Sequence, residues 1–93
     1  MEEKFLKAWF AARSQAEQLG VRLHPLEPEK AMAQAHRELS GHRDSEGFCH
    51  LQKLGRLDLT LEALAVSARF TALFNDEEAN NALKRLMDAG YEF

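Results

Sequence analysis

The chain has 93 residues, of which 45% are hydrophobic and 29% are charged, and its formal net charge is −3. This length and balance predict one small folded domain over residues 1–93, and they exclude a disordered or low-complexity chain. A domain of this size buries roughly 60 to 70% of its unfolded surface, which leaves little room for a large substrate cavity. We therefore expect a noncatalytic protein that needs no cofactor.

The cysteine content and the charge distribution bear on the compartment and the partners. The single cysteine, Cys49, cannot form a disulfide within the chain, which favours a reducing compartment and hence the cytoplasm. No apolar run approaches the roughly 20 residues of a membrane helix. Residues 57–93 carry seven acidic and three basic side chains, whereas residues 1–56 are nearly balanced. We expect a cytoplasmic protein with no membrane partner and no general attraction to nucleic acids.

The first third of the chain predicts two helices with an extended connector between them. Apolar residues recur every three or four positions over residues 2–19, which indicates an amphipathic helix that ends before Gly20. Two prolines in the next segment, VRLHPLEP, keep the residues before them out of the helical region. Pro28 then suits the first turn of a second helix, which runs to about Ser40.

The middle of the chain predicts two shorter helices. Asp44 or Ser45 is expected to cap a third helix that ends at Gly55. Its apolar side consists of Phe48, Leu51 and Leu54. The following segment, RLDLTLEALAV, alternates like a strand, yet Thr60 is a good N-cap. We expect a helix there, because one lone strand would have no partner.

The clearest helix start is Asn75, because Glu78 three residues later completes a variant of the capping box. This last helix is expected to end at Gly90, and the closing YEF to fold back onto the core. Its predicted buried stripe consists of Ala79, Leu83 and Leu86. The chain therefore predicts an all-α, compact single-domain bundle of four to six short helices, with the first and last helices supplying most of the core.

Three of the four histidines and Cys49 lie within residues 36–50, so this stretch is a candidate metal site. Structural zinc sites place their ligands in close pairs such as C-x2-C or H-x3–5-H, whereas the gaps here are irregular. We expect no metal ligands, with Cys49 a small buried residue. Residues 42–45, HRDS, resemble parts of a kinase catalytic loop or a hydrolase triad, but the chain lacks the other motifs and the rigid scaffold that these sites need. We expect Asp44 and Ser45 to be ordinary helix-cap residues.

A helix-turn-helix outline lies within residues 45–69, where a short helix, a turn at Gly55 and a helix from Thr60 follow one another. Its second helix offers Glu62 and Arg69, which is a poor set for reading base edges. A DNA-binding regulator is therefore the alternative function, and it requires the basic side chains of this region to share a face. The candidate contacts are Arg37, Arg43, Lys53, Arg56 and Arg69.

Aromatic side chains near both ends of the chain are the candidates for binding a protein partner, because such residues often anchor interfaces. They are Phe5, Trp9, Tyr91 and Phe93. Trp9 lies in the strongest amphipathic stripe, so it is either a core residue or an interface anchor. We expect a small noncatalytic interaction or regulatory protein that acts through protein–protein contacts, including contact with a second copy of itself.

Overall fold

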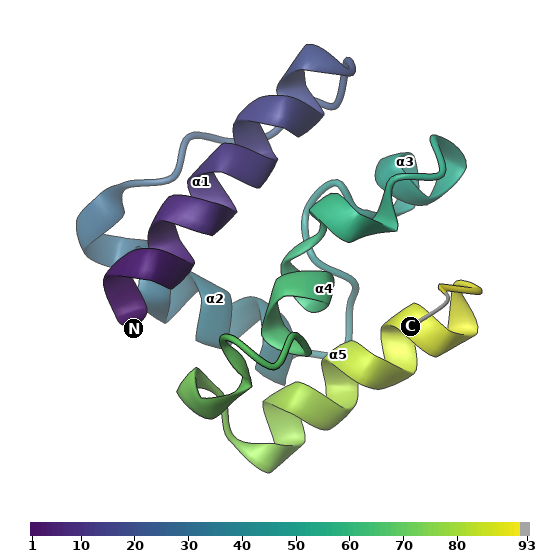
Figure 1. The fold of residues 1–93 in the computed structure, drawn as a ribbon. Helices are drawn as coiled ribbons and strands as arrows, with labels where there is room; N and C mark the ends of the chain where they lie inside the picture. The colour runs from purple at the N-terminus through teal and green to yellow at the C-terminus, as the bar shows by residue number, and fades with distance from the viewer. Residues whose placement is uncertain (92–93) are drawn as a thin grey trace.

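The computed structural model describes residues 1–91, which form five α-helices and three short 3₁₀ turns (Figure 1). The helices are α1 (Glu2–Gln18), α2 (Ala31–Ser40), α3 (Phe48–Lys53), α4 (Leu61–Ala65) and α5 (Asp76–Asp88). No strand occurs among these residues, so the expected all-α class with four to six short helices is confirmed. Their radius of gyration is 12.0 Å, close to the roughly 12 Å of a compact chain of this length.

The helix signals in the sequence act at the expected positions. Gly20, which follows α1, has a φ of 95°. The Thr60 hydroxyl accepts a hydrogen bond of 3.1 Å from the backbone N–H of Ala63 at the start of α4. Asn75 and Glu78 form a complete capping box, in which each side chain accepts from the other residue's backbone N–H at 2.8 and 3.0 Å. The predicted starts of α4 and α5 are therefore confirmed.

The predicted cap of α3 is wrong. Gly47, rather than Asp44 or Ser45, precedes this helix, and it has a φ of 82°. A Cβ atom at Gly47 would lie only 2.9 Å from Cδ2 of Leu23 in the connector after α1. Because the connector packs so closely here, glycine suits both the backbone angle and the available space. Ser45 is then free to contact α4, as described below.

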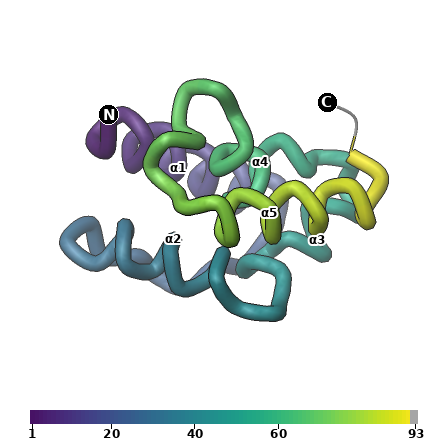
Figure 2. Tube along the Cα trace, turned by 90° about the horizontal axis from the view of Figure 1, so that it is seen from below, coloured from purple at the N-terminus to yellow at the C-terminus, as the bar shows by residue number. Residues whose placement is uncertain are grey.

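The short α4 lies between α1 and α5 in Figure 1, and Figure 2 shows α1 and α4 on one side of the molecule with α2 on the other. α5 packs against both α4 and α2. The largest core cluster joins these layers through Phe5, whose ring centroid lies 5.5 Å from that of Phe70 and 5.3 Å from that of Phe74. Both partner rings come from the segment between α4 and α5, so this loop helps to build the core.

The expectation that the first and last helices supply most of the core is wrong. Of the eighteen buried hydrophobic residues in the described part of the chain, α1 contributes four and α5 two. Most of the other buried hydrophobic residues come from the middle of the chain. The segments on both sides of the short α4 bury leucine or phenylalanine side chains. The connections between helices therefore carry much of the hydrophobic stabilisation.

Two leucines that the sequence placed on buried stripes are exposed. Leu54 follows the last residue of α3, and its side chain is 43% exposed. Leu83 on α5 is 38% exposed, because the helix turns a different side toward the core. The buried residues of α5 are Glu78, Ala82 and Leu86.

Candidate interaction surface

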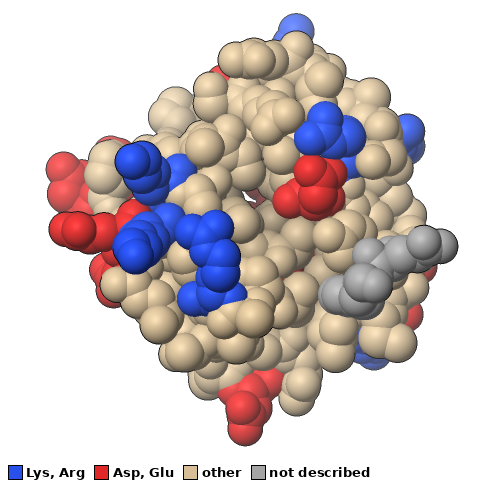
Figure 3. All heavy atoms as spheres, viewed as in Figure 1, with Lys and Arg blue, Asp and Glu red and all other residues tan. Residues whose placement is uncertain are grey.

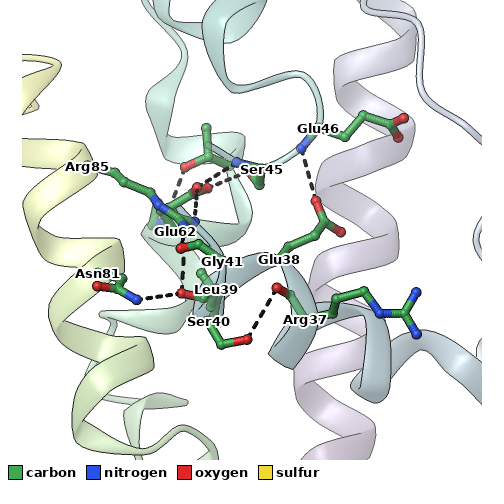
Figure 4. A network of polar contacts seen from close by, with 12 residues as sticks. Arg37, Glu38, Leu39, Ser40, Gly41, Ser45, Glu46, Glu62, Asn81 and Arg85 are labelled. Carbon is green, nitrogen blue, oxygen red and sulfur yellow. Dashed lines mark hydrogen bonds and ion pairs between the residues drawn. The ribbon is translucent and has the colours of Figure 1, made fainter. Parts of the chain in front are cut away.

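A buried polar network fixes the position of α5 (Figure 4). Its centre is Glu62 on α4, which is 0% exposed. The Glu62 carboxylate accepts hydrogen bonds from Arg85 on α5 at 3.1 Å and from the Ser45 backbone N–H at 2.9 Å. The Ser45 hydroxyl donates a hydrogen bond to the other oxygen of the Glu62 carboxylate. Because a buried charge is costly unless it is paired, this carboxylate holds three segments together.

The same network ties α5 to the end of α2. The guanidinium of Arg85 donates to the backbone carbonyl of Gly41 at 2.8 Å, and the Asn81 amide donates to the carbonyl of Leu39 at 2.9 Å (Figure 4). The last carbonyls of a helix have no partner within it, so these side chains satisfy groups that α2 leaves open. Asn81 and Arg85 therefore set the rotation of α5 about its own axis.

A second contact fixes the beginning of α5. The His36 ring nitrogen Nδ1 lies 2.8 Å from the Glu78 carboxylate, whose other oxygen takes part in the capping box with Asn75. Glu78 is buried, whereas the His36 side chain is partly exposed. One glutamate therefore both starts α5 and joins it to α2.

With that rotation fixed, α5 presents Leu83 and Met87 to the solvent. Their side chains are 38% and 62% exposed, and they lie one helical turn apart. We call these two residues the α5 patch. The other exposed large hydrophobic residues in the described part of the chain lie singly on separate segments. They are Met1, Leu19 and Leu54.

Beyond the first turn of α5, charged residues border the α5 patch on one flank only. In Figure 3 the surface between the Asp and Glu side chains at the lower edge and the grey residues is mainly uncharged, with a few Lys, Arg, Asp or Glu atoms visible along its outer rim. The charged residues in the second half of α5 project from other parts of the helix circumference than the α5 patch. They are Lys84, Arg85 and Asp88. At about 100° of rotation per residue, Lys84 and Asp88 lie beside Leu83 and Met87 on one flank, whereas Ala79 and Gly90 lie on the other flank.

The aromatic residues predicted to bind a partner lie mainly inside the fold. Phe5 and Trp9 are buried, and Trp9 is only 3% exposed. Neither ring offers a contact surface, so the core alternative for Trp9 is the one that the structure supports. Tyr91 is half-buried against a cluster that includes Leu86. Phe93 lies outside the described residues.

The basic residues proposed to contact DNA do not form one face. Arg37 and Arg43 line the same surface hollow. Arg69 lies in the segment between α4 and α5, with its guanidinium carbon 4.8 Å from the centre of the Phe70 ring. Lys53 lies on α3, and Figures 1 and 2 show α3 far from that segment. The largest group of Lys and Arg side chains visible in Figure 3 lies instead over the first half of α1, and the others are scattered over the rest of that face.

The helix-turn-helix outline is also incomplete. Arg56 forms an ion pair with Asp58 through two hydrogen bonds, of 3.1 and 3.2 Å. This pair holds the pKa of the Asp58 carboxyl below its usual value and raises the pKa of Arg56. α4 has only five residues, and its Glu62 side chain is buried rather than turned outward. A helix of this length offers little surface to a major groove.

The histidines and the cysteine of residues 36–50 lie apart. His36 contacts Glu78, and His42 and His50 are exposed. Cys49 is exposed too, which corrects the expectation that it is buried. In residues 1–91, no three His, Cys, Asp or Glu side chains lie close enough to hold a metal ion.

The sequence reasoning missed the α5 patch because it assigned Leu83 to the core. A signal was nevertheless present. Ala82 and Leu86 project about 40° apart around the helix, and Leu83 and Met87 form a second such pair about 100° further round. Together the two pairs span about 140° of the helix circumference, which is wider than the roughly 100° of a minimal buried stripe.

Within residues 1–91, no helix is long and apolar enough to cross a membrane. Comparisons of the chain with protein-family models, with curated proteins and with solved structures find no match.

Proposed function

We propose that this chain is a small, noncatalytic, cytoplasmic interaction or regulatory protein that binds another protein through the α5 patch. The observation that carries the proposal is the exposure of Leu83 and Met87 one turn apart on α5, next to a flank of the helix that has no charged residue beyond its first turn. Neighbouring exposed apolar side chains are one mark of a protein interaction site. The exposed thiol of Cys49 is consistent with a reducing compartment.

The chemistry of the patch suits protein binding. Burying it removes two large apolar side chains from water without stripping the hydration shell of a charged group. Methionine adapts to partners of different shape, because its side chain is unbranched and polarizable. The core of protein interfaces is depleted in charged residues and enriched in methionine, as this surface is.

The polar interior offers less support for catalysis. Ser45 and Glu62, which are buried together, are both engaged in the network that holds α4 and α5. The cavity that Ser45 helps to line has a volume of about 10 Å³, which is room for roughly one water molecule. The scattered basic residues likewise give no reason to prefer DNA binding, so we advance no second function.

Site-specific photo-crosslinking in the cells that make the protein tests this proposal. A photoreactive residue in place of Met87 is expected to yield a defined protein adduct, and Leu83→Asp is expected to abolish it. The matched control carries the same group in place of Leu19, which is also exposed but lies at the end of α1. Equal adducts from both positions, or no adduct from position 87, would refute the proposal.

A further inference from the structure

Two opposite charges flank the α5 patch. Lys84 follows Leu83 and Asp88 follows Met87, so both charges lie on the same side of the apolar pair, one turn apart. Both side chains are exposed, and both line one surface hollow beside α5. Neither has an ion-pair partner among residues 1–91. The patch therefore carries a positive and a negative group that this chain does not itself neutralise.

We infer that the occupant of the α5 patch is a second copy of this chain, with the two α5 helices antiparallel across a two-fold axis. The inference rests on the proposed function, because it uses the same patch. A two-fold axis requires a self-complementary contact, because both copies use the same residues and these residues meet in reverse order along the helix. An apolar pair flanked by one positive and one negative group meets that requirement.

The register follows from the rise of 1.5 Å per residue in an α-helix. When Leu83 lies opposite the partner's Met87, the two-fold axis passes at the level of residue 85. Lys84 then lies within about 3 Å, along the helix axis, of the partner's Asp88. In an antiparallel pair the same flank of each helix meets, so the two side chains face each other. Symmetry repeats both contacts, which gives two apolar contacts and two ion pairs.

The acidic start of α5 favours the antiparallel direction. In a parallel pair, the first turns with Asp76 and Glu77 would lie side by side and repel each other. In the antiparallel pair they lie at opposite ends, with the two copies of Glu77 about 24 Å apart along the axis, well beyond the screening distance of roughly 8 Å at physiological salt. Asn80 then lies level with the partner's Gly90, which has no side chain to obstruct the approach.

Charge reversal with recovery tests this arrangement. Sedimentation equilibrium over a range of protein concentrations is expected to show a dimer for the wild type. Lys84→Asp and Asp88→Lys are each expected to weaken it by about tenfold, because each substitution places like charges together twice. The double variant with both substitutions restores opposite charges across the interface, and its dissociation constant is expected to return to within about threefold of the wild type. Lys53→Asp on α3 is the control, and should leave the dimer unchanged.

Several outcomes would overturn the inference. A wild type that stays monomeric at every concentration would do so, and so would a double variant that is at least as weak as either single variant. These failures are distinguishable from failure of the proposed function. If the wild type is monomeric while position 87 still crosslinks to a different protein, only the second copy is refuted. If no adduct forms either, both proposals fail.

Discussion

Replacing Arg85 by methionine is expected to lower the free energy of unfolding by about 3 to 5 kcal/mol, because it leaves a buried charge unpaired. Glu62 is 0% exposed, and Arg85 donates the bond of 3.1 Å that neutralises it. The substitution also removes the donor of 2.8 Å to the carbonyl of Gly41. Methionine keeps most of the volume and the helix propensity of arginine, so packing and helix formation contribute little to the loss.

The magnitude is a large part of the stability of the fold. A domain of this kind is stable by about 5 to 15 kcal/mol, so Arg85→Met removes about a third to a half of a value in the middle of that range. With a urea m-value of about 1 to 2 kcal/mol/M, the midpoint of urea unfolding is expected to fall by about 1.5 to 5 M. Circular dichroism at 222 nm reports this transition, since the fold is helical. Lys53→Met, on the exposed side of α3, is the control and should change the free energy by less than about 0.5 kcal/mol.

A second substitution isolates the charge from the shape. Glu62→Gln in the Arg85→Met background removes the stranded charge, and the amide oxygen still accepts from Ser45. This double variant is expected to be more stable than Arg85→Met alone, by at least about 1 kcal/mol. The reasoning is refuted if Arg85→Met costs less than about 1 kcal/mol, or if the glutamine lowers stability further.

The remaining predictions concern the core and the surface ion pair. Trp9→Ala should cost about 3 to 5 kcal/mol in urea unfolding, because it removes a large ring that is 3% exposed; full stability would contradict the core assignment. The ion pair with Arg56 lowers the pKa of Asp58 in the folded state. The pair therefore stabilises the fold at pH values above the unfolded pKa of about 4. This stabilisation is lost as the pH falls through the lowered folded pKa. Asp58→Asn should therefore unfold at a lower temperature than the wild type at neutral pH, and this difference should shrink as the pH falls through the lowered folded pKa of Asp58; a difference that grows toward acid would reverse the expected sign.

Local signals in the sequence were reliable where both partners lie within one turn. Asn75 and Glu78 are three residues apart, so their capping box forms from the sequence of that segment alone. Thr60 caps α4 through the N–H of Ala63, again within one turn. The prediction for α3 failed because its start depends on Leu23, which packs against Gly47 from a segment more than twenty residues away.

The candidate site was less predictable than the helices around it. Hydrophobic periodicity showed that α5 is amphipathic but did not distinguish Leu83 from Ala82 as the inward residue. The choice was made by Arg85, whose partners Glu62 and Gly41 are 23 and 44 positions away. Such contacts between distant residues leave little trace in a single sequence, because neither partner is unusual in its own segment.

By itself, the sequence determined that this chain is helical and where most of its helices begin and end, because caps, glycines and periodicity act over a few residues. Only the tertiary structure decided which side of each helix became interior. Trp9 became a core residue in a cluster whose centre is Phe5, which contacts Trp9 on α1 and Phe70 and Phe74 from the segment between α4 and α5. Leu83 and Met87 became surface because buried polar groups must find partners, and satisfying Glu62 set the rotation of α5.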